Sequence, residues 1–151
     1  MRDSYADSEI LLVEDNPAEA ALAIRAFEKN QISNPIHLAA DGEQALDFIF
    51  GRGKFKGQNL IQKLELILLD INIPIINGLE VLKILKSERL LKNIPVVMLT
   101  TSEEESDIRR AYEYGANSYL IKPQGFHEFI DEIGILGTYW LTLNKTVVKL
   151  D

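Results

Sequence analysis

Polar residues of a few chemically useful types follow directly on mostly apolar runs of the chain. In chain order they are Glu14, Asp15, Asp70, Thr100 and Lys122. Three carboxylates that meet in one crevice repel one another, so a cation is needed to hold them together. An all-oxygen set of ligands suits a hard divalent ion. We therefore expect Mg²⁺ here, with Mn²⁺ as an alternative, bound directly by Asp15 and Asp70 and through water by Glu14.

Asp70 is the candidate nucleophile of this set. It follows the apolar run 66–69, so a rigid strand rather than a loop should present its carboxylate. A carboxylate can attack phosphorus and form an acyl phosphate. Phosphoryl transfer needs mainly positioning and charge neutralisation, which the metal ion and Lys122 can supply. The Thr100 hydroxyl can then donate a hydrogen bond to the phosphoryl oxygens.

The elements that must position these residues alternate along the chain. Short apolar runs predict strands, and segments with helical spacing between turn residues predict helices. The expected strands are 10–13, 36–39, 64–69, 96–99 and 118–121. The expected helices are 18–29, 43 to about 50, 79–89, a segment that starts at 103–105 and ends at Gly115, and 126 to about 143. Residues 51–63 contain three glycines and predict an exposed loop.

This alternation predicts an α/β protein with a flavodoxin-like doubly wound (βα)5 fold. The five parallel strands should lie in the order 2-1-3-4-5, with right-handed crossovers and helices on both faces. In such a sheet the active crevice lies outside the carboxyl ends of the strands, where the strand order reverses. The candidate residues all follow strand ends, so they should meet there.

Length and composition set the wider limits. The 151 residues suit one domain, with a core from about residue 9 to 143 and a short C-terminal tail. No cysteine is present, which removes disulfides and thiolate metal sites and makes the cytoplasm the expected compartment. The apolar runs are too short to span a membrane. A net charge of -7 argues against a nucleic-acid-binding surface.

Four motifs resemble the receiver domains of two-component response regulators. They are LLVEDNPAEA, LLDINIPIINGLEVL, IPVVMLTTS and GANSYLIKP. The resemblance implies that a histidine kinase phosphorylates Asp70 and that Asn72 gives a backbone carbonyl to the metal. It also implies that Thr100 and Tyr119 form a switch pair, that Lys122 contacts the phosphoryl group, and that the peptide bond between Lys122 and Pro123 is cis.

The long loop and the C-terminal run ILGTYWLTLN resemble the single-domain regulators that partner cyanobacterial phytochrome-type kinases. Such a protein is a phosphoacceptor rather than an enzyme, and an unknown downstream protein must read its state. Two alternatives remain. An aspartyl-phosphate phosphohydrolase needs a second acid where this chain has Asn72, and a receiver-like scaffold that is never phosphorylated would not need the complete acidic set.

Apolar residues of the last helix exceed what one sheet face can cover. We expect Phe126, Phe129, Ile130, Ile133, Trp140 and Leu143 on one stripe, with Ile135, Leu136 and Tyr139 partly off it. The surplus predicts a homodimer through the face of helix four, strand five and helix five. Arg52, Lys54 and Lys56 form a basic cluster, which is either a solvated loop or a docking site for the kinase. His37 and His127 are given no role.

Overall fold

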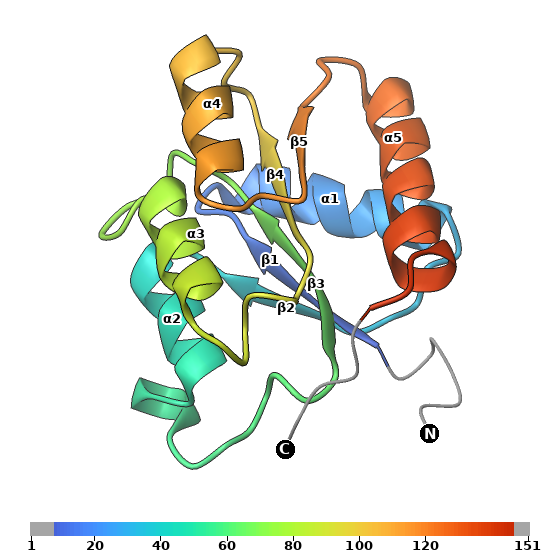
Figure 1. Cartoon of the computed structure of the whole chain (residues 1–151). Coiled ribbons are helices and arrows are strands. Elements are labelled where there is room, and N and C mark those ends of the chain that lie inside the picture. The colour runs from blue at the N-terminus through green and yellow to red at the C-terminus, as the bar shows by residue number, and fades with distance from the viewer. Residues whose placement is uncertain (1–7, 147–151) are drawn as a thin grey trace.

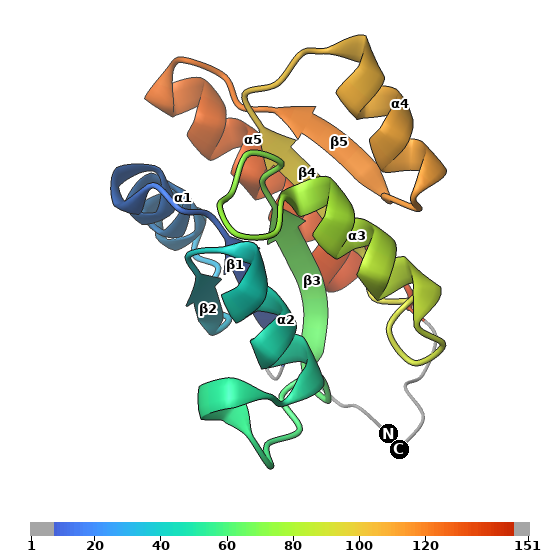
Figure 2. The same cartoon turned by 90° about the vertical axis from the view of Figure 1, so that its left-hand side faces the viewer.

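Five parallel strands form one sheet, with helices on both of its faces (Figures 1 and 2). The strand order is β2-β1-β3-β4-β5, which confirms the predicted fold. The computed structural model describes residues 8–146, so the last residues of the predicted tail lie outside the described part. The strands are β1 (Glu9–Val13), β2 (Ile36–Ala39), β3 (Leu64–Leu69), β4 (Val96–Thr100) and β5 (Ser118–Ile121). The helices are α1 (Pro17–Lys29), α2 (Gly42–Phe50), η2 (Gly53–Phe55), α3 (Gly78–Ser87), α4 (Glu105–Glu113), α5 (Phe126–Thr138) and η3 (Tyr139–Leu143).

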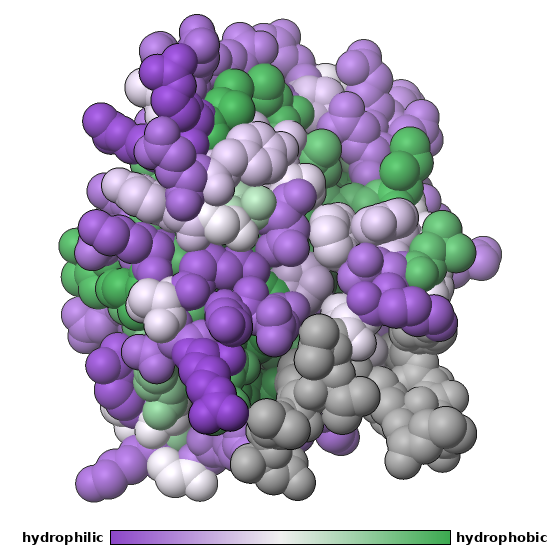
Figure 3. Space-filling view, viewed as in Figure 1, coloured by the Kyte–Doolittle hydropathy of each residue, from purple (hydrophilic) through white to green (hydrophobic). Residues whose placement is uncertain are grey.

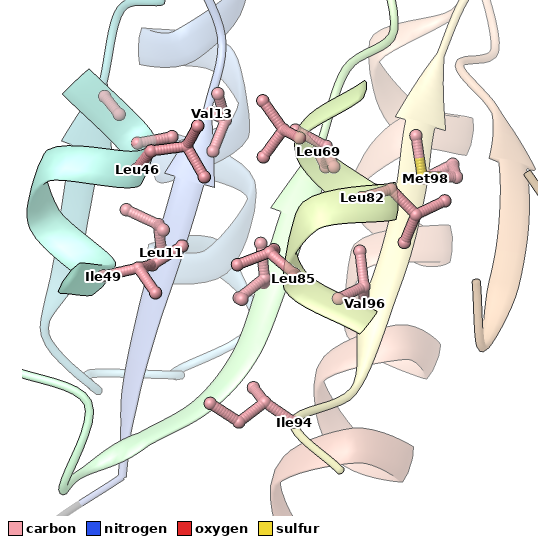
Figure 4. Packing of buried hydrophobic residues seen from close by; sticks show 14 of the residues in the cluster. Leu11, Val13, Leu46, Ile49, Leu69, Leu82, Leu85, Ile94, Val96 and Met98 are labelled. Carbon is pink, nitrogen blue, oxygen red and sulfur yellow. The ribbon is translucent and has the colours of Figure 1, made fainter. Parts of the chain in front are cut away.

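The central strands β1, β3 and β4 are mostly apolar because both faces of the sheet are covered. Along β1, Leu11 and Val13 pack against one cluster of buried residues, while Ile10 and Leu12 pack against the other. The first cluster lies between the sheet and the helices α2 and α3 (Figure 4). The second lies between the sheet and the helices α1 and α5. Two cores hold the strands rigidly, so residues at the strand ends have fixed positions.

Several helices begin at the carboxyl edge of the sheet because polar residues there cap them. Asn16 accepts hydrogen bonds from the backbone N–H groups of Ala18 and Glu19, at 2.9 and 3.2 Å. Asn77 accepts one from the N–H of Glu80, at 3.0 Å. Such caps satisfy backbone donors that have no partner within the helix. Helix N-termini therefore surround the strand ends.

Three local expectations need correction. The last α-helix ends at Thr138, and residues 139–143 continue as a π-helical turn rather than as regular helix. The predicted stripe is also shifted, because Leu136 is buried whereas Leu143 is 65% exposed. The loop 51–63 contains the short helix η2. Among residues 8–146 no helix is long and apolar enough to cross a membrane.

Candidate functional site

Lys122 connects the ends of four strands at the carboxyl edge of the sheet. Its ammonium group is hydrogen bonded to Oε1 of Glu14, which follows β1. The same nitrogen lies 3.3 Å from Oδ2 of Asp70, which follows β3. Lys122 itself follows β5, and its backbone N–H donates to the carbonyl of Thr100 in β4 at 2.7 Å. The predicted convergence of Glu14, Asp70 and Lys122 is therefore present.

The carboxylates of this cluster are largely out of water. Glu14 is 4% and Asp70 is 8% exposed. Burial raises the pKa of Glu14, although the hydrogen bond from Lys122 opposes the rise. Burial alone would lower the pKa of Lys122, but the hydrogen bond to Glu14 and the charges of the nearby carboxylates raise it. The site therefore holds a lysine that stays protonated among carboxylates of opposite charge.

The backbone after Asp70 turns tightly against the start of α3. The N–H of Gly78 donates to the carbonyl of Ile71 at 2.8 Å, and the N–H of Asn72 donates to Oδ1 of Asp70 at 3.4 Å. A Cβ atom at Gly78 would lie 2.0 Å from the carbonyl oxygen of Asp70. Only glycine permits this approach. Through the hydrogen bond from Asn72, this loop fixes the orientation of the Asp70 carboxylate.

Thr100 and Tyr119 each form a hydrogen bond with the backbone of Ser102. Thr100 is fully buried, and its Oγ1 accepts a hydrogen bond from the N–H of Ser102 at 3.3 Å. The Tyr119 hydroxyl donates to the carbonyl oxygen of Ser102 at 2.9 Å. The Ser102 hydroxyl donates to Oδ2 of Asp107 in α4, at 2.6 Å. The loop between β4 and α4 therefore links the site to the first turn of α4.

The structure differs from expectation in two features of the site, the peptide bond before Pro123 and the positions of the acidic pair Glu14 and Asp15. The peptide bond between Lys122 and Pro123 is trans, as are all others among residues 8–146. The trans isomer is the intrinsically favoured one, by about 0.5–1 kcal/mol. Asp15 is exposed, and Glu14 turns towards Lys122. Within the described chain, no three His, Asp or Glu side chains are gathered closely enough to hold a metal ion.

Sequence reasoning missed Glu19, whose Oε1 lies 3.4 Å from the Lys122 nitrogen. Glu19 is in the first turn of α1, three residues after the capping residue Asn16. Acidic residues are common there because they favour the helix dipole, so this position carried no special signal. The structure adds it as a third carboxylate around one lysine.

The residues present nevertheless fit a hard divalent cation. Glu14, Asp70 and Glu19 surround a single ammonium group, which leaves an excess of negative charge at the crevice. Asp15 adds a further exposed carboxylate at the start of α1, and the site offers only oxygen donors. Charge and donor type therefore suit Mg²⁺ or Mn²⁺.

A parallel sheet of this order, with paired carboxylates and a lysine at its switch point, is the architecture of a phosphoacceptor signalling domain. The response regulator receiver domain matches residues 10–134, and the chain belongs to that family. Receiver domains accept a phosphoryl group from a histidine kinase and bind a divalent metal ion.

The chain is similar to two regulators along most of their length. It is 42% identical over 137 residues to the probable methanogenesis regulatory protein FilR2 of Methanothrix harundinacea, with 91% of this chain and 86% of that protein covered. It is 35% identical over 132 residues to the response regulator Rcp1 of Synechocystis, with 87% and 88% covered.

Solved structures agree with this relationship. The Mn²⁺-bound form of Rcp1 superposes with a TM-score of 0.83 at 33% identity, covering 93% of this chain and 99% of that one. The phosphorylated cyanobacterial phytochrome response regulator RcpA gives 0.84 at 32% identity, covering 92% and 97%. The chain is thus a response regulator similar to those of phytochrome signalling.

Proposed function

We propose that Asp70 is the phosphoacceptor and that the reaction depends on Mg²⁺, with Mn²⁺ as a substitute. The main support for this proposal is that the ammonium group of Lys122 forms ion pairs with both Glu14 and Asp70. Asp70 lies at the end of a strand that is buried along its whole length. This arrangement presents one carboxylate rigidly, beside a fixed positive charge.

In the proposed reaction, a carboxylate oxygen of Asp70 attacks the phosphorus atom of a phosphohistidine. The bond from phosphorus to the imidazole nitrogen breaks, its electron pair stays on that nitrogen, and the departing ring takes up one proton from water. Lys122 neutralises charge on the transferred group, and the Thr100 hydroxyl donates a hydrogen bond to it. The product is an acyl phosphate on Asp70 and a neutral imidazole on the kinase.

Glu14, Asp15, Asp70 and the backbone carbonyl of Asn72 are the proposed metal ligands. A bound divalent cation supplies charge neutralisation for the phosphoryl oxygens. The carboxylates of Glu14 and Asp70 already carry more charge than Lys122 compensates, which supports this assignment.

The test is incubation with acetyl phosphate and Mg²⁺, followed by intact mass measurement. We expect the gain of one phosphoryl group in the wild type and in Asp47→Asn, a matched change on α2. Asp70→Asn, or removal of the metal with a chelator, should abolish the gain. An unmodified wild type would refute the proposal. Continuous release of phosphate from small phosphate esters would instead support a phosphohydrolase, although Asn72 occupies the position of its second acid.

The proposed donor is a phytochrome-type histidine kinase, because Rcp1 and RcpA are similar to this chain along nearly its whole length. The proposed readout is a contact with another protein. Tyr119 and α4 are linked to Thr100 through Ser102, so a charge at Asp70 can alter the surface that they form.

A homodimer through α4, β5 and α5 is the proposed assembly. Ile121 is 38%, Ile135 71% and Tyr139 47% exposed, and hydrophobic residues lie among hydrophilic ones over α5 in Figure 3. A hollow of about 410 Å³ lies beside them, lined by residues that include Leu120 and Trp140. Sedimentation at micromolar concentrations should show a dimer that Ile135→Glu dissociates. A wild type that stays monomeric, phosphorylated or not, would exclude this assembly.

A further inference from the structure

The segment between α2 and β3 differs in charge from the rest of the protein. Residues 51–63, with the sequence GRGKFKGQNLIQK, contain four cations and no carboxylate, in a chain of net charge -7. We call this segment the basic loop. Its cations Arg52, Lys54, Lys56 and Lys63 are all exposed. A local concentration of positive charge on an acidic protein attracts acidic ligands.

The basic loop is anchored to the core of the protein. Phe55 packs edge-on against the buried ring of Phe48, with 5.3 Å between the ring centroids. Leu60 and Ile61 pack against the same core cluster as Phe55. The chain turns through Gly51 with a φ of 65°, next to η2. The cations are therefore carried on an ordered scaffold, which lowers the entropy that binding must remove.

Most of these cations have no acidic partner among residues 8–146. The Nε atom of Arg52 lies 3.5 Å from Oδ1 of Asp47. Across the described part of the chain, Lys54, Lys56 and Lys63 form no ion pair. The Lys54 ammonium lies 5.2 Å from the centroid of the Phe55 ring. The surface thus offers unpaired positive charge beside aromatic rings.

The basic loop lies at the opposite edge of the sheet from the phosphorylation site. Lys63 precedes β3 and Asp70 follows it, so the six residues of this strand separate them by ~20 Å. Figures 1 and 2 both show the loop at the end of the molecule away from the carboxyl ends of the strands. A partner bound to the loop would leave Asp70 open to a phosphodonor.

We infer that the basic loop is a docking site for a short acidic segment of a protein partner. The charge distribution favours a short peptide over nucleic acid. A long polyanion such as nucleic acid would extend beyond the loop. It would then meet a negatively charged surface that repels it, because the rest of the chain is strongly acidic. An acidic peptide can end where the basic loop ends.

Fluorescence anisotropy of the full chain tests this inference, with a labelled peptide of glutamates around one phenylalanine as the probe. We expect binding that weakens as the salt concentration rises from about 50 to about 200 mM. Lys54→Glu with Lys56→Glu should weaken binding by about tenfold, because each change turns an exposed attraction into a repulsion. Lys83→Glu with Lys92→Glu is the matched control, since these lysines are also exposed but lie outside the loop.

The control variant should bind the peptide as the wild type does, and both double variants should still be labelled by acetyl phosphate. Equal weakening in the two double variants would show a general charge effect and overturn the docking site. So would an absence of peptide binding by the wild type. Tighter binding to a thymidine oligonucleotide or to anionic vesicles than to the peptide would also overturn the assignment to a protein segment.

Discussion

Replacing Lys122 by methionine tests the ion-pair network at the centre of the site. The change keeps the aliphatic stem but leaves Glu14 and Asp70 without the cation that they share. At 3.3 Å and an effective dielectric constant of about 20, a single such attraction has a gross value of about 5 kcal/mol, most of which offsets the cost of desolvation. Removing one partner of a buried pair typically destabilises a protein by about 3–5 kcal/mol.

We expect the lower end of this range, about 3 kcal/mol at pH 7, for two reasons. Glu19 is 39% exposed at its side chain, so its contact with Lys122 adds little. Glu14 can also take up a proton, because burial already raises its pKa. The melting temperature should fall by about 6–12 °C.

The loss should depend on pH, with a defined sign. A buried carboxyl group whose folded-state pKa is raised binds its proton more tightly in the folded protein than in the unfolded chain. The variant lacks the lysine that opposes this rise, so its stability should fall more steeply than that of the wild type as pH increases above about 4.5. Adding Glu14→Gln to the variant should remove the extra pH dependence.

Urea unfolding of the wild type, Lys122→Met and the double variant, at pH 5 and pH 7, measures these differences. Lys92→Met is the matched control, because Lys92 is exposed and should contribute within about 0.5 kcal/mol. An unchanged unfolding midpoint for Lys122→Met at pH 7 would refute the interpretation that Lys122 holds the carboxylates together.

Three further outcomes follow from neighbouring contacts. Asp107→Ala should cost about 1 kcal/mol by removing the acceptor of the Ser102 hydroxyl, and should change the lifetime of the phosphorylated state, measured by loss of the mass adduct. Gly78→Ala should lower both the unfolding free energy and the yield of phosphorylated protein, because its Cβ would collide with the Asp70 carbonyl; normal values for both would contradict this. Burial lowers the pKa of Lys86 to about 8, so between about pH 8 and 10.5 the unfolded chain binds the proton more tightly than the folded protein. Wild-type stability should therefore rise with pH relative to Lys86→Met over that range, and parallel curves would disprove the shift.

Much of the fold was predictable because its signals are local. Apolar runs predicted the strand ends, and helical spacing predicted the helix starts to within one or two residues. The capping side chains Asn16 and Asn77 of the structure are local as well, because each acts on backbone groups within three residues of it. Asp70 was identifiable for the same reason, because it directly follows a strand with no polar residue in its last four positions. Parallel connection of such strands brings their ends to one edge whatever the details of packing.

The remaining features depend on contacts between distant parts of the chain. Glu19 reaches Lys122 across 103 positions of sequence, and Tyr119 reaches Ser102 across 17. The π-helical turn after Thr138 and the exposure of Leu143 likewise reflect how α5 meets its neighbours. The sequence by itself determined which residues stand at the strand ends, because periodicity and capping are local. Only the tertiary structure decided which of them touch, because the direction of a long charged side chain is set by the charges that folding brings around it.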